Sequence, residues 1–213
     1  MIDFTDTINV CAKNGDRLTD DARYLHDFDR YASSYALSKI AQEEYAKCFI
    51  LKLVSAGALE WTQEVRRSLN HHVSKQLMVI ILEYVNPDYD DFLEMINNGS
   101  SLQQPRKVSD AINIYIHEIL RRWQSQNWAW VEEPEYDSEA KRVFDGRDDK
   151  IKQDALYTKI FKDGKGIDST DKFTKEISYK EIEKADRYGC FMGNSENDYR
   201  YKKIVDLISL LKE

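Results

Sequence analysis

Residues that interrupt helices are scarce in this chain. Only three of its 213 residues are proline and eight are glycine. Because proline and glycine are the least favourable residues inside a helix, their scarcity argues against a disordered or fibrous chain. Apolar residues make up 42% and charged residues 32% of the sequence. This balance is typical of a soluble, mainly helical protein.

Cysteine is also scarce, and long apolar runs are missing. Cys11, Cys48 and Cys190 are far apart and odd in number, which argues against a disulfide framework and a CxxC metal site. The N-terminal MIDFTDTINV carries acids where a secretory signal carries positive charge. The chain also has no run of about eighteen apolar residues, which is the length needed to span a membrane. We therefore expect a cytoplasmic protein that does not enter the membrane.

The common cofactor and nucleotide motifs are absent. The chain has no HExxH, GxxxxGK or GxGxxG, so we expect neither a metal nor a cofactor. Its net charge of -7 argues against a large, sequence-independent platform for nucleic acid. A local basic pocket stays open, because residues 66–75 hold Arg66, Arg67 and Lys75 without an acid, whereas residues 131–149 are rich in Asp and Glu.

Apolar residues recur at helical spacing over four long stretches. The pattern predicts helices over residues 4–26, 31–56, 59–84 and 108–130. Gly15 is a weak point or a break in the first helix, and Gly57 ends the second. Four amphipathic helices with short connections predict a mainly α fold, built as an antiparallel four-helix bundle over residues 1–131.

Residues 132–213 have a different texture and predict a smaller C-terminal appendage packed on the bundle, or one continuous domain with it. The sequence DALYTKIFKDGKG alternates like a short strand or hairpin that ends in a glycine-rich turn. Ser178 with Glu181 resembles a capping box for a helix that runs to Met192. Residues 195–197 can cap a last helix.

Two adjacent carboxylates on the second helix stand out. Glu44 lies four residues from both Ile40 and Cys48, so the pattern predicts that it points toward the apolar face. Glu43 lies four residues before Lys47, and the pair could be a surface ion pair worth about 0.3–0.5 kcal/mol. A partly desolvated carboxylate marks either a functional group or a structural ion pair.

The third helix carries a basic segment with two histidines. The spacing predicts that His72 faces the bundle and that His71 is rotated away from it by about 100°. Arg66 and Arg67 each precede a histidine by five positions, and Lys75 follows. A lone inward histidine is usually a core residue, but here basic and acidic groups from two helices accompany it.

This set suits RNA cleavage through the 2′-hydroxyl. A histidine can transfer protons near neutral pH, and arginine or lysine can stabilise phosphorane charge without a metal. On one continuous helix, however, Arg67 and His72 would point about 140° apart. They can share a site only if a helix begins near Asn70 or if a second subunit completes the site.

Four segments carry a resemblance to a known family. NGDRLTDDARYL at residues 14–25, YALSKIAQEEYAK at 35–47, HHVSK at 71–75 and DALYTKIF at 154–161 resemble the AbiV-type abortive infection proteins of the HEPN superfamily. The resemblance is strongest over residues 14–76. It implies a four-helix HEPN bundle, usually a homodimer, and a bacterial anti-phage role in which host growth or translation is arrested.

The resemblance also implies site residues. Many HEPN proteins are metal-independent ribonucleases that use an arginine, four to six residues and then a histidine, a spacing that Arg67 and His72 match. Catalytic roles would fall to Arg67, His72, Glu43, Glu44 and Lys47. Binding of the RNA substrate would fall to Arg66, His71 and Lys75.

The sequence leaves a non-catalytic reading open. Ser68 stands where such ribonucleases usually carry Asn, Asp or His. The alternative to an RNA-cleaving enzyme is therefore an interaction protein that binds a phage or host protein through its helical bundle. A phage-encoded activator fits either reading.

Overall fold

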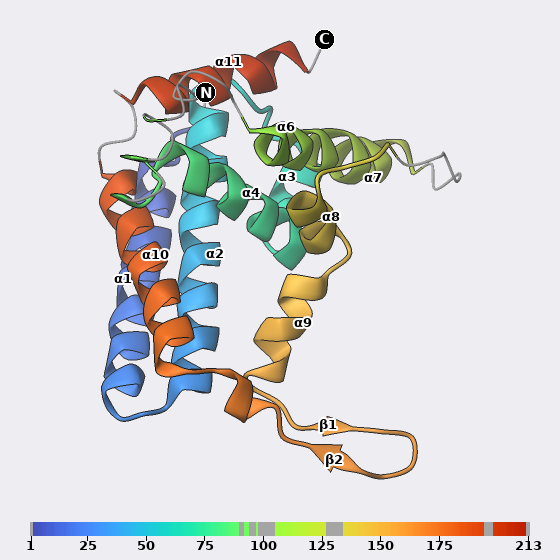
Figure 1. Cartoon of the computed structure of the whole chain (residues 1–213). Helices are drawn as coiled ribbons and strands as arrows, with labels where there is room; N and C mark the ends of the chain where they lie inside the picture. The colour runs from blue at the N-terminus through green and yellow to red at the C-terminus, as the bar shows by residue number, and fades with distance from the viewer. Residues whose placement is uncertain are drawn as a thin grey trace.

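The chain folds into a mainly helical structure, as predicted. The computed structural model describes residues 2–89, 92–93, 97, 105–126, 134–193 and 198–211 (Figure 1). Its principal elements are, in order, α1 (Thr5–Asp27), α2 (Tyr31–Ser55), α3 (Gln63–Ser68), α4 (His72–Val85), α6 (Arg106–Asn113), η2 (Ile114–Arg121), α7 (Arg122–Ser125), α8 (Ser138–Phe144), α9 (Arg147–Asp154), β1 (Lys159–Ile160), β2 (Gly166–Ile167), η3 (Thr170–Lys172), α10 (Lys175–Met192) and α11 (Tyr199–Leu210).

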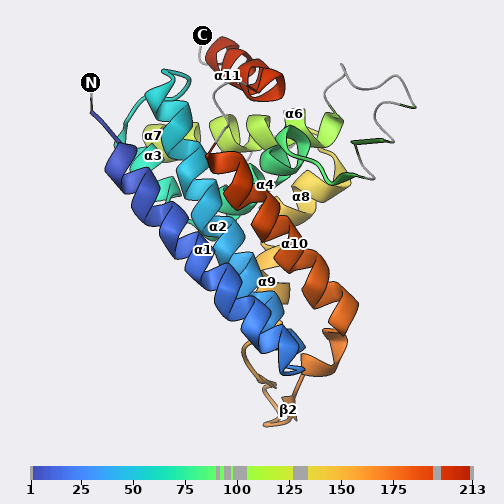
Figure 2. The same cartoon turned by 90° about the vertical axis from the view of Figure 1, so that its left-hand side faces the viewer.

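Helices α1, α2 and α10 lie side by side and form the long body of the molecule (Figures 1 and 2). Gly15 does not break α1, which runs unbroken through it. A Cβ atom at Gly15 would lie 2.7 Å from the ring of Tyr45, and one at Gly189 would lie 2.9 Å from the Tyr45 hydroxyl. These two glycines therefore make room for a buried tyrosine between the three helices.

The predicted third helix is in fact two helices, so the single helix over 59–84 is wrong. α3 ends at Ser68 and α4 begins at His72. The Thr62 side chain accepts a hydrogen bond from the amide of Val65 and caps α3, and His71 caps α4 by accepting from the amide of Ser74. A helix start near Asn70 was one of the two ways in which the sequence allowed Arg67 and His72 to share a site.

The fourth predicted helix begins at Arg106 and continues through η2, a stretch of π-helix, into α7. Gln126, with φ 51°, ends it in the left-handed region. The predicted end at residue 130 lies outside the described residues. This helix packs chiefly on α4, whereas α10 lies against α1 and α2. The helix that completes the bundle next to α1 and α2 thus comes from the C-terminal part of the chain.

The predicted hairpin is confirmed. Strands β1 and β2 pair antiparallel, with Lys159 opposite Ile167 and Ile160 opposite Gly166, and they project away from the body (Figure 1). The predicted cap of α10 is wrong, because Thr174 caps that helix and Ser178 lies inside it. Asp198 caps α11, and the predicted caps at 195–197 lie outside the described residues. The domain boundary at residue 131 also falls outside them and stays a prediction.

A buried polar chain joins the three long helices. The hydroxyl of Ser34 donates to the backbone oxygen of Ala22, and that of Ser178 donates to Ser34 Oγ, at 2.7 and 2.8 Å. Nδ1 of His26 lies 3.2 Å from Ser178 Oγ. The helical pattern places His26 on a polar face and predicts exposure, but only 8% of it is exposed. α10 covers this face, and its Ser178 is the hydrogen-bond partner of Nδ1.

One continuous apolar core joins α1, α2, α4, α6, η2, α8, α10 and α11. α2 lies at its centre and is buried on most of its circumference. Within the described part of the chain, no helix is both long and apolar enough to cross a membrane.

Candidate active site

Glu43, in the middle of α2, is the centre of a buried cluster of charges. Only 2% of it is exposed. Four side chains direct donors at its two oxygens. His72 Nδ1 and Lys75 Nζ each lie 2.7 Å from Oε2, while Lys152 Nζ lies 2.5 Å and Gln76 Nε2 3.2 Å from Oε1. A buried carboxylate with this many donors has its hydrogen-bonding capacity satisfied.

The cluster keeps Glu43 ionised. Burial by itself raises the pKa of Glu43, but the positive charges of Lys75 and Lys152, and their hydrogen bonds, outweigh burial and hold that pKa at about 2. The carboxylate therefore carries its negative charge across the whole physiological pH range.

The start of α4 places three of the four donors. His72, Lys75 and Gln76 occupy positions i, i+3 and i+4 of that helix and so share one face. Because α4 packs on α2, this face meets Glu43. Figure 1 shows α4 crossing beside α2.

His72 closes the cluster toward solvent. Its side chain is 52% exposed, whereas those of Lys75 and Lys152 are 7% and 6% exposed. In one neutral tautomer Nδ1 accepts from Lys152 Nζ at 3.0 Å, and in the other, the Nδ1–H tautomer, it donates to the ionised Glu43 at 2.7 Å. In that tautomer Nε2 carries the lone pair, on the ring edge that points away from Glu43.

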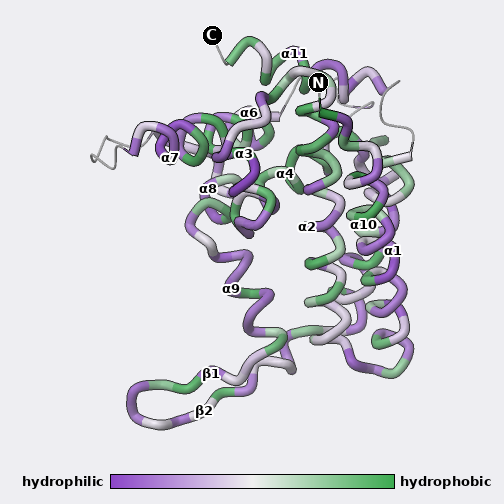
Figure 3. Tube along the Cα trace, turned by 180° about the vertical axis from the view of Figure 1, so that it is seen from behind, coloured by the Kyte–Doolittle hydropathy of each residue, from purple (hydrophilic) through white to green (hydrophobic). Residues whose placement is uncertain are grey.

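The fourth donor comes from α9, and the sequence pattern does not predict it. Lys152 Nζ contacts Glu43 Oε1, Asp149 Oδ1 at 2.8 Å and His72 Nδ1 at 3.0 Å. α9 is short and strongly hydrophilic (Figure 3), so it offers no apolar stripe that would predict which face is buried. Only the i, i+3 spacing of Asp149 and Lys152 hinted at a pair.

Glu43, His72 and Asp149 form a group whose ligand atoms lie within 4.8 Å of one another, close enough to hold a metal ion. The ammonium of Lys152 contacts all three residues. A metal would have to displace this built-in cation and would then face Lys75 as well. These three residues are therefore better suited to binding the ammonium of Lys152 than to binding a metal ion.

The two adjacent glutamates are both buried, with exposed fractions of 2% for Glu43 and 9% for Glu44. The inward position predicted for Glu44 is therefore confirmed, whereas the surface pair of Glu43 with Lys47 does not form, because Glu43 belongs to the buried charge cluster. Lys47 Nζ instead lies 2.6 Å from Glu44 Oε1, next to Cys11 on the side of α2 that faces α1. Glu43 is buried as well because α2 is buried on most sides, so its apolar residues do not define one inward direction.

The second arginine of the basic segment lies on an aromatic ring. The guanidinium carbon of Arg67 is 4.2 Å from the centre of the Trp123 ring, a cation–π contact. His71 meets the edge of the same ring, with centroids 5.1 Å apart. The pKa of His71 lies below its usual value because of burial and the nearby charge of Arg67. Arg66 is exposed.

Ser68 has a structural environment. It is fully buried, and its hydroxyl lies 2.8 Å from the backbone oxygen of Val65 and 2.9 Å from the hydroxyl of Tyr115. The contact with Tyr115 connects the last residue of α3 to η2. The structure thus brings His72, Lys75 and Glu43 together, keeps Arg67 and His71 on the neighbouring Trp123, and leaves Glu44 with Lys47 on another side of α2.

The HEPN_AbiV family model, described as AbiV, matches residues 4–189. The chain belongs to this family. The match runs from α1 to near the end of α10 and includes Glu43, His72 and Lys152. Searches among curated proteins and among solved structures return no match. Membership of the family supports the assignment of this chain as an abortive-infection protein of the HEPN superfamily.

Proposed function

We propose that this chain is an anti-phage abortive-infection protein that arrests host growth or translation by cleaving RNA without a metal. The observation that carries the proposal is the pair formed by Glu43 and His72. An ionised, buried carboxylate holds Nδ1 of a half-exposed imidazole at 2.7 Å. This arrangement orients a proton-transfer group toward solvent.

In the proposed reaction, Nε2 of His72 removes the proton from an RNA 2′-hydroxyl. The 2′-oxygen forms a bond to the adjacent phosphorus, the bond from phosphorus to the 5′-oxygen breaks, and the imidazolium returns its proton to that oxygen. Glu43 stabilises the transient imidazolium without taking its proton.

The cations divide into two groups by exposure. Lys75 and Lys152 are almost fully buried against Glu43, so we assign them to positioning Glu43 rather than to contacting phosphate. Arg66 and Arg67 are exposed and remain available to bind the RNA backbone. Glu44 and Lys47 lie outside this cluster, which favours a structural role for them.

The test is incubation of the purified protein with total RNA in the presence of EDTA. We expect cleavage by the wild type and a loss of about 100-fold or more in rate for His72→Ala, the scale of general acid–base catalysis. His117→Ala is the matched control, because His117 is a partly exposed histidine on another helix. Cleavage that persists undiminished in His72→Ala would remove this site from the mechanism.

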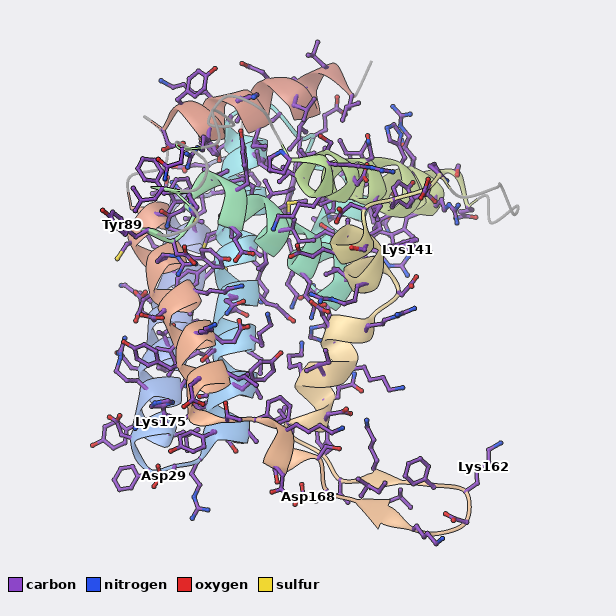
Figure 4. All side chains as sticks on the ribbon, viewed as in Figure 1. Asp29, Tyr89, Lys141, Lys162, Asp168 and Lys175 are labelled. Carbon is purple, nitrogen blue, oxygen red and sulfur yellow. The ribbon has the colours of Figure 1, made fainter. Side chains whose placement is uncertain are left out.

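The non-catalytic alternative has an observation of its own. Ile160, Phe161 and Ile167 are 78%, 50% and 48% exposed on the projecting hairpin, with Lys162 at its far end (Figure 4). Exposed apolar side chains on an isolated two-stranded hairpin favour binding to another protein. Growth arrest that survives His72→Ala but is lost in Ile160→Asp would favour this alternative.

A further inference from the structure

A cation and an aromatic ring meet beside the candidate active site. The guanidinium carbon of Arg67, near the end of α3, lies 4.2 Å from the centre of the Trp123 ring. Trp123 belongs to α7, and Figures 1 and 2 show α3 next to α7. The contact occupies one side of the guanidinium. The N–H groups that are directed away from the ring remain free to donate.

Arg67 has no carboxylate to neutralise it within the described part of the chain. Several other arginines do pair with an Asp or Glu side chain, namely Arg17, Arg23, Arg106, Arg122, Arg142 and Arg147. Arg67 is exposed, and so is its neighbour Arg66, which likewise has no such pair among the described residues. An exposed, unpaired guanidinium suits the oxygens of a phosphate group.

A tight turn places Arg67 next to the start of α4. The backbone amide of Asn70 donates to the oxygen of Arg67, and that of His71 donates to the oxygen of Ser68, both at 3.1 Å. α4 then begins at His72. Arg67 and His72 therefore flank one closed turn, so an RNA strand that meets one of them can also meet the other.

The surroundings of Trp123 fix its ring. His71 meets the ring edge, with centroids 5.1 Å apart, and its own Nδ1 lies 2.9 Å from Ser74 Oγ. The hydroxyls of Ser68 and Tyr115, 2.9 Å apart, connect α3 to η2, which runs directly into α7. The indole also packs against the apolar core. The ring is therefore held by packing, whereas a long exposed arginine by itself has many rotamers of similar energy.

We propose that Trp123 is a positioning residue for RNA binding, because its ring holds the guanidinium of Arg67 where that group contacts a phosphate beside His72. The inference rests on the proposed function, since its ligand is the RNA whose cleavage we assign to His72. An arginine that is already ordered loses less conformational entropy on binding, so the affinity rises without a new contact. In this proposal His71 supports the ring rather than contacting the RNA.

The experiment measures binding of the full chain to a single-stranded RNA oligonucleotide that carries a 2′-O-methyl group on every ribose. This ligand lacks the 2′-hydroxyl and is not cleaved, and fluorescence anisotropy gives its affinity at several salt concentrations. Arg67→Ala should weaken binding and reduce the slope of log affinity against log salt by about 0.7, as for one lost phosphate contact on a single strand. Trp123→Leu should weaken binding by about two- to fivefold, the scale of an exposed cation–π contact, and leave the slope unchanged.

Two comparisons separate positioning from a purely structural role. In the Arg67→Ala background, Trp123→Leu should have no further effect on affinity, because the ring then has no guanidinium to hold. Trp123→Phe keeps an aromatic ring and should bind more tightly than Trp123→Leu. Trp61→Leu is the matched control and should leave affinity unchanged, because the Trp61 ring packs against Phe4. Circular dichroism checks that each variant is folded.

Three results would overturn the inference: no binding by the folded wild type, wild-type affinity in Trp123→Leu, or effects of Trp123→Leu and Arg67→Ala that simply add. Failure of the proposed function is recognised separately. Binding that depends on Trp123, without cleavage of unmodified RNA, contradicts the proposed function and leaves the inference standing. Cleavage that is lost in His72→Ala, together with normal binding by Trp123→Leu, supports the proposed function and overturns the inference.

Discussion

At the scale of single residues, Glu43 is the centre of the buried charge cluster. A carboxylate that is 2% exposed is costly to bury unless charged donors surround it. Lys75 and Lys152 supply that compensation; without Glu43, Lys152 would keep its contact with Asp149, whereas Lys75 would lose the carboxylate it contacts. The half-exposed His72 is the member of the cluster best placed to meet a substrate. The cluster therefore compensates a buried carboxylate and also presents one half-exposed imidazole to solvent.

Glu43→Gln should destabilise the fold at neutral pH. The pKa of Glu43 is about 2 in the folded protein against an ordinary value of 4.5. A lowered folded-state pKa contributes stability above the unfolded pKa, and this contribution is lost as pH falls from about 4.5 toward 2. We expect about 3 kcal/mol of destabilisation at pH 7.

The measurement is urea unfolding of wild type and Glu43→Gln at pH 7 and at pH 3. The difference between the two proteins should shrink at the lower pH, because wild-type Glu43 then loses part of its advantage. Glu60→Gln, at an exposed glutamate, should change stability little at either pH. A difference that is the same at both pH values would contradict the assigned ionic role.

At the scale of elements, the candidate site depends on a helix start and on a short helix far away in sequence. α4 begins at His72 and thereby places His72, Lys75 and Gln76 on one face. α9 contributes Lys152 and Asp149, yet it has little apolar surface of its own (Figure 3). We infer that the contact between Lys152 and Glu43 is what chiefly holds α9 against α2.

Lys152→Ala should loosen α9. We expect faster amide hydrogen exchange over residues 147–154. Exchange in α1 should change little, because α1 packs on α2 and α10 rather than on α9. Lys150→Ala is the matched control, since Lys150 is exposed on the same helix. Unchanged exchange over 147–154 in Lys152→Ala would show that other contacts hold α9.

At the scale of the whole molecule, one continuous core joins the N-terminal helices to α10 and α11. The exposed arginines, His72 and the projecting hairpin lie outside that core, where a second molecule could reach them. We propose that the chain forms a homodimer, as HEPN proteins often do.

Sedimentation equilibrium tests the dimer. We expect a molar mass of about twice the 25.0 kDa of one chain, with dissociation on dilution if the interface is of ordinary size. The measurement should be repeated with Ile160→Asp, which tests whether the hairpin takes part. A single species at the mass of one chain at all concentrations would rule the dimer out.

The sequence by itself determined the helical class, the bounds of α1 and α2, the hairpin and the family, because these follow from local periodicity, turn residues and recognisable segments. It also singled out Glu43, His72 and Lys75. Only the tertiary structure decided that α10 completes the bundle, that Glu43 rather than Glu44 is enclosed by charges, and that Lys152 joins the site. The physical reason is that each of these depends on which helix covers which face, and a helix buried on most sides, such as α2, carries no single stripe that reveals its neighbours.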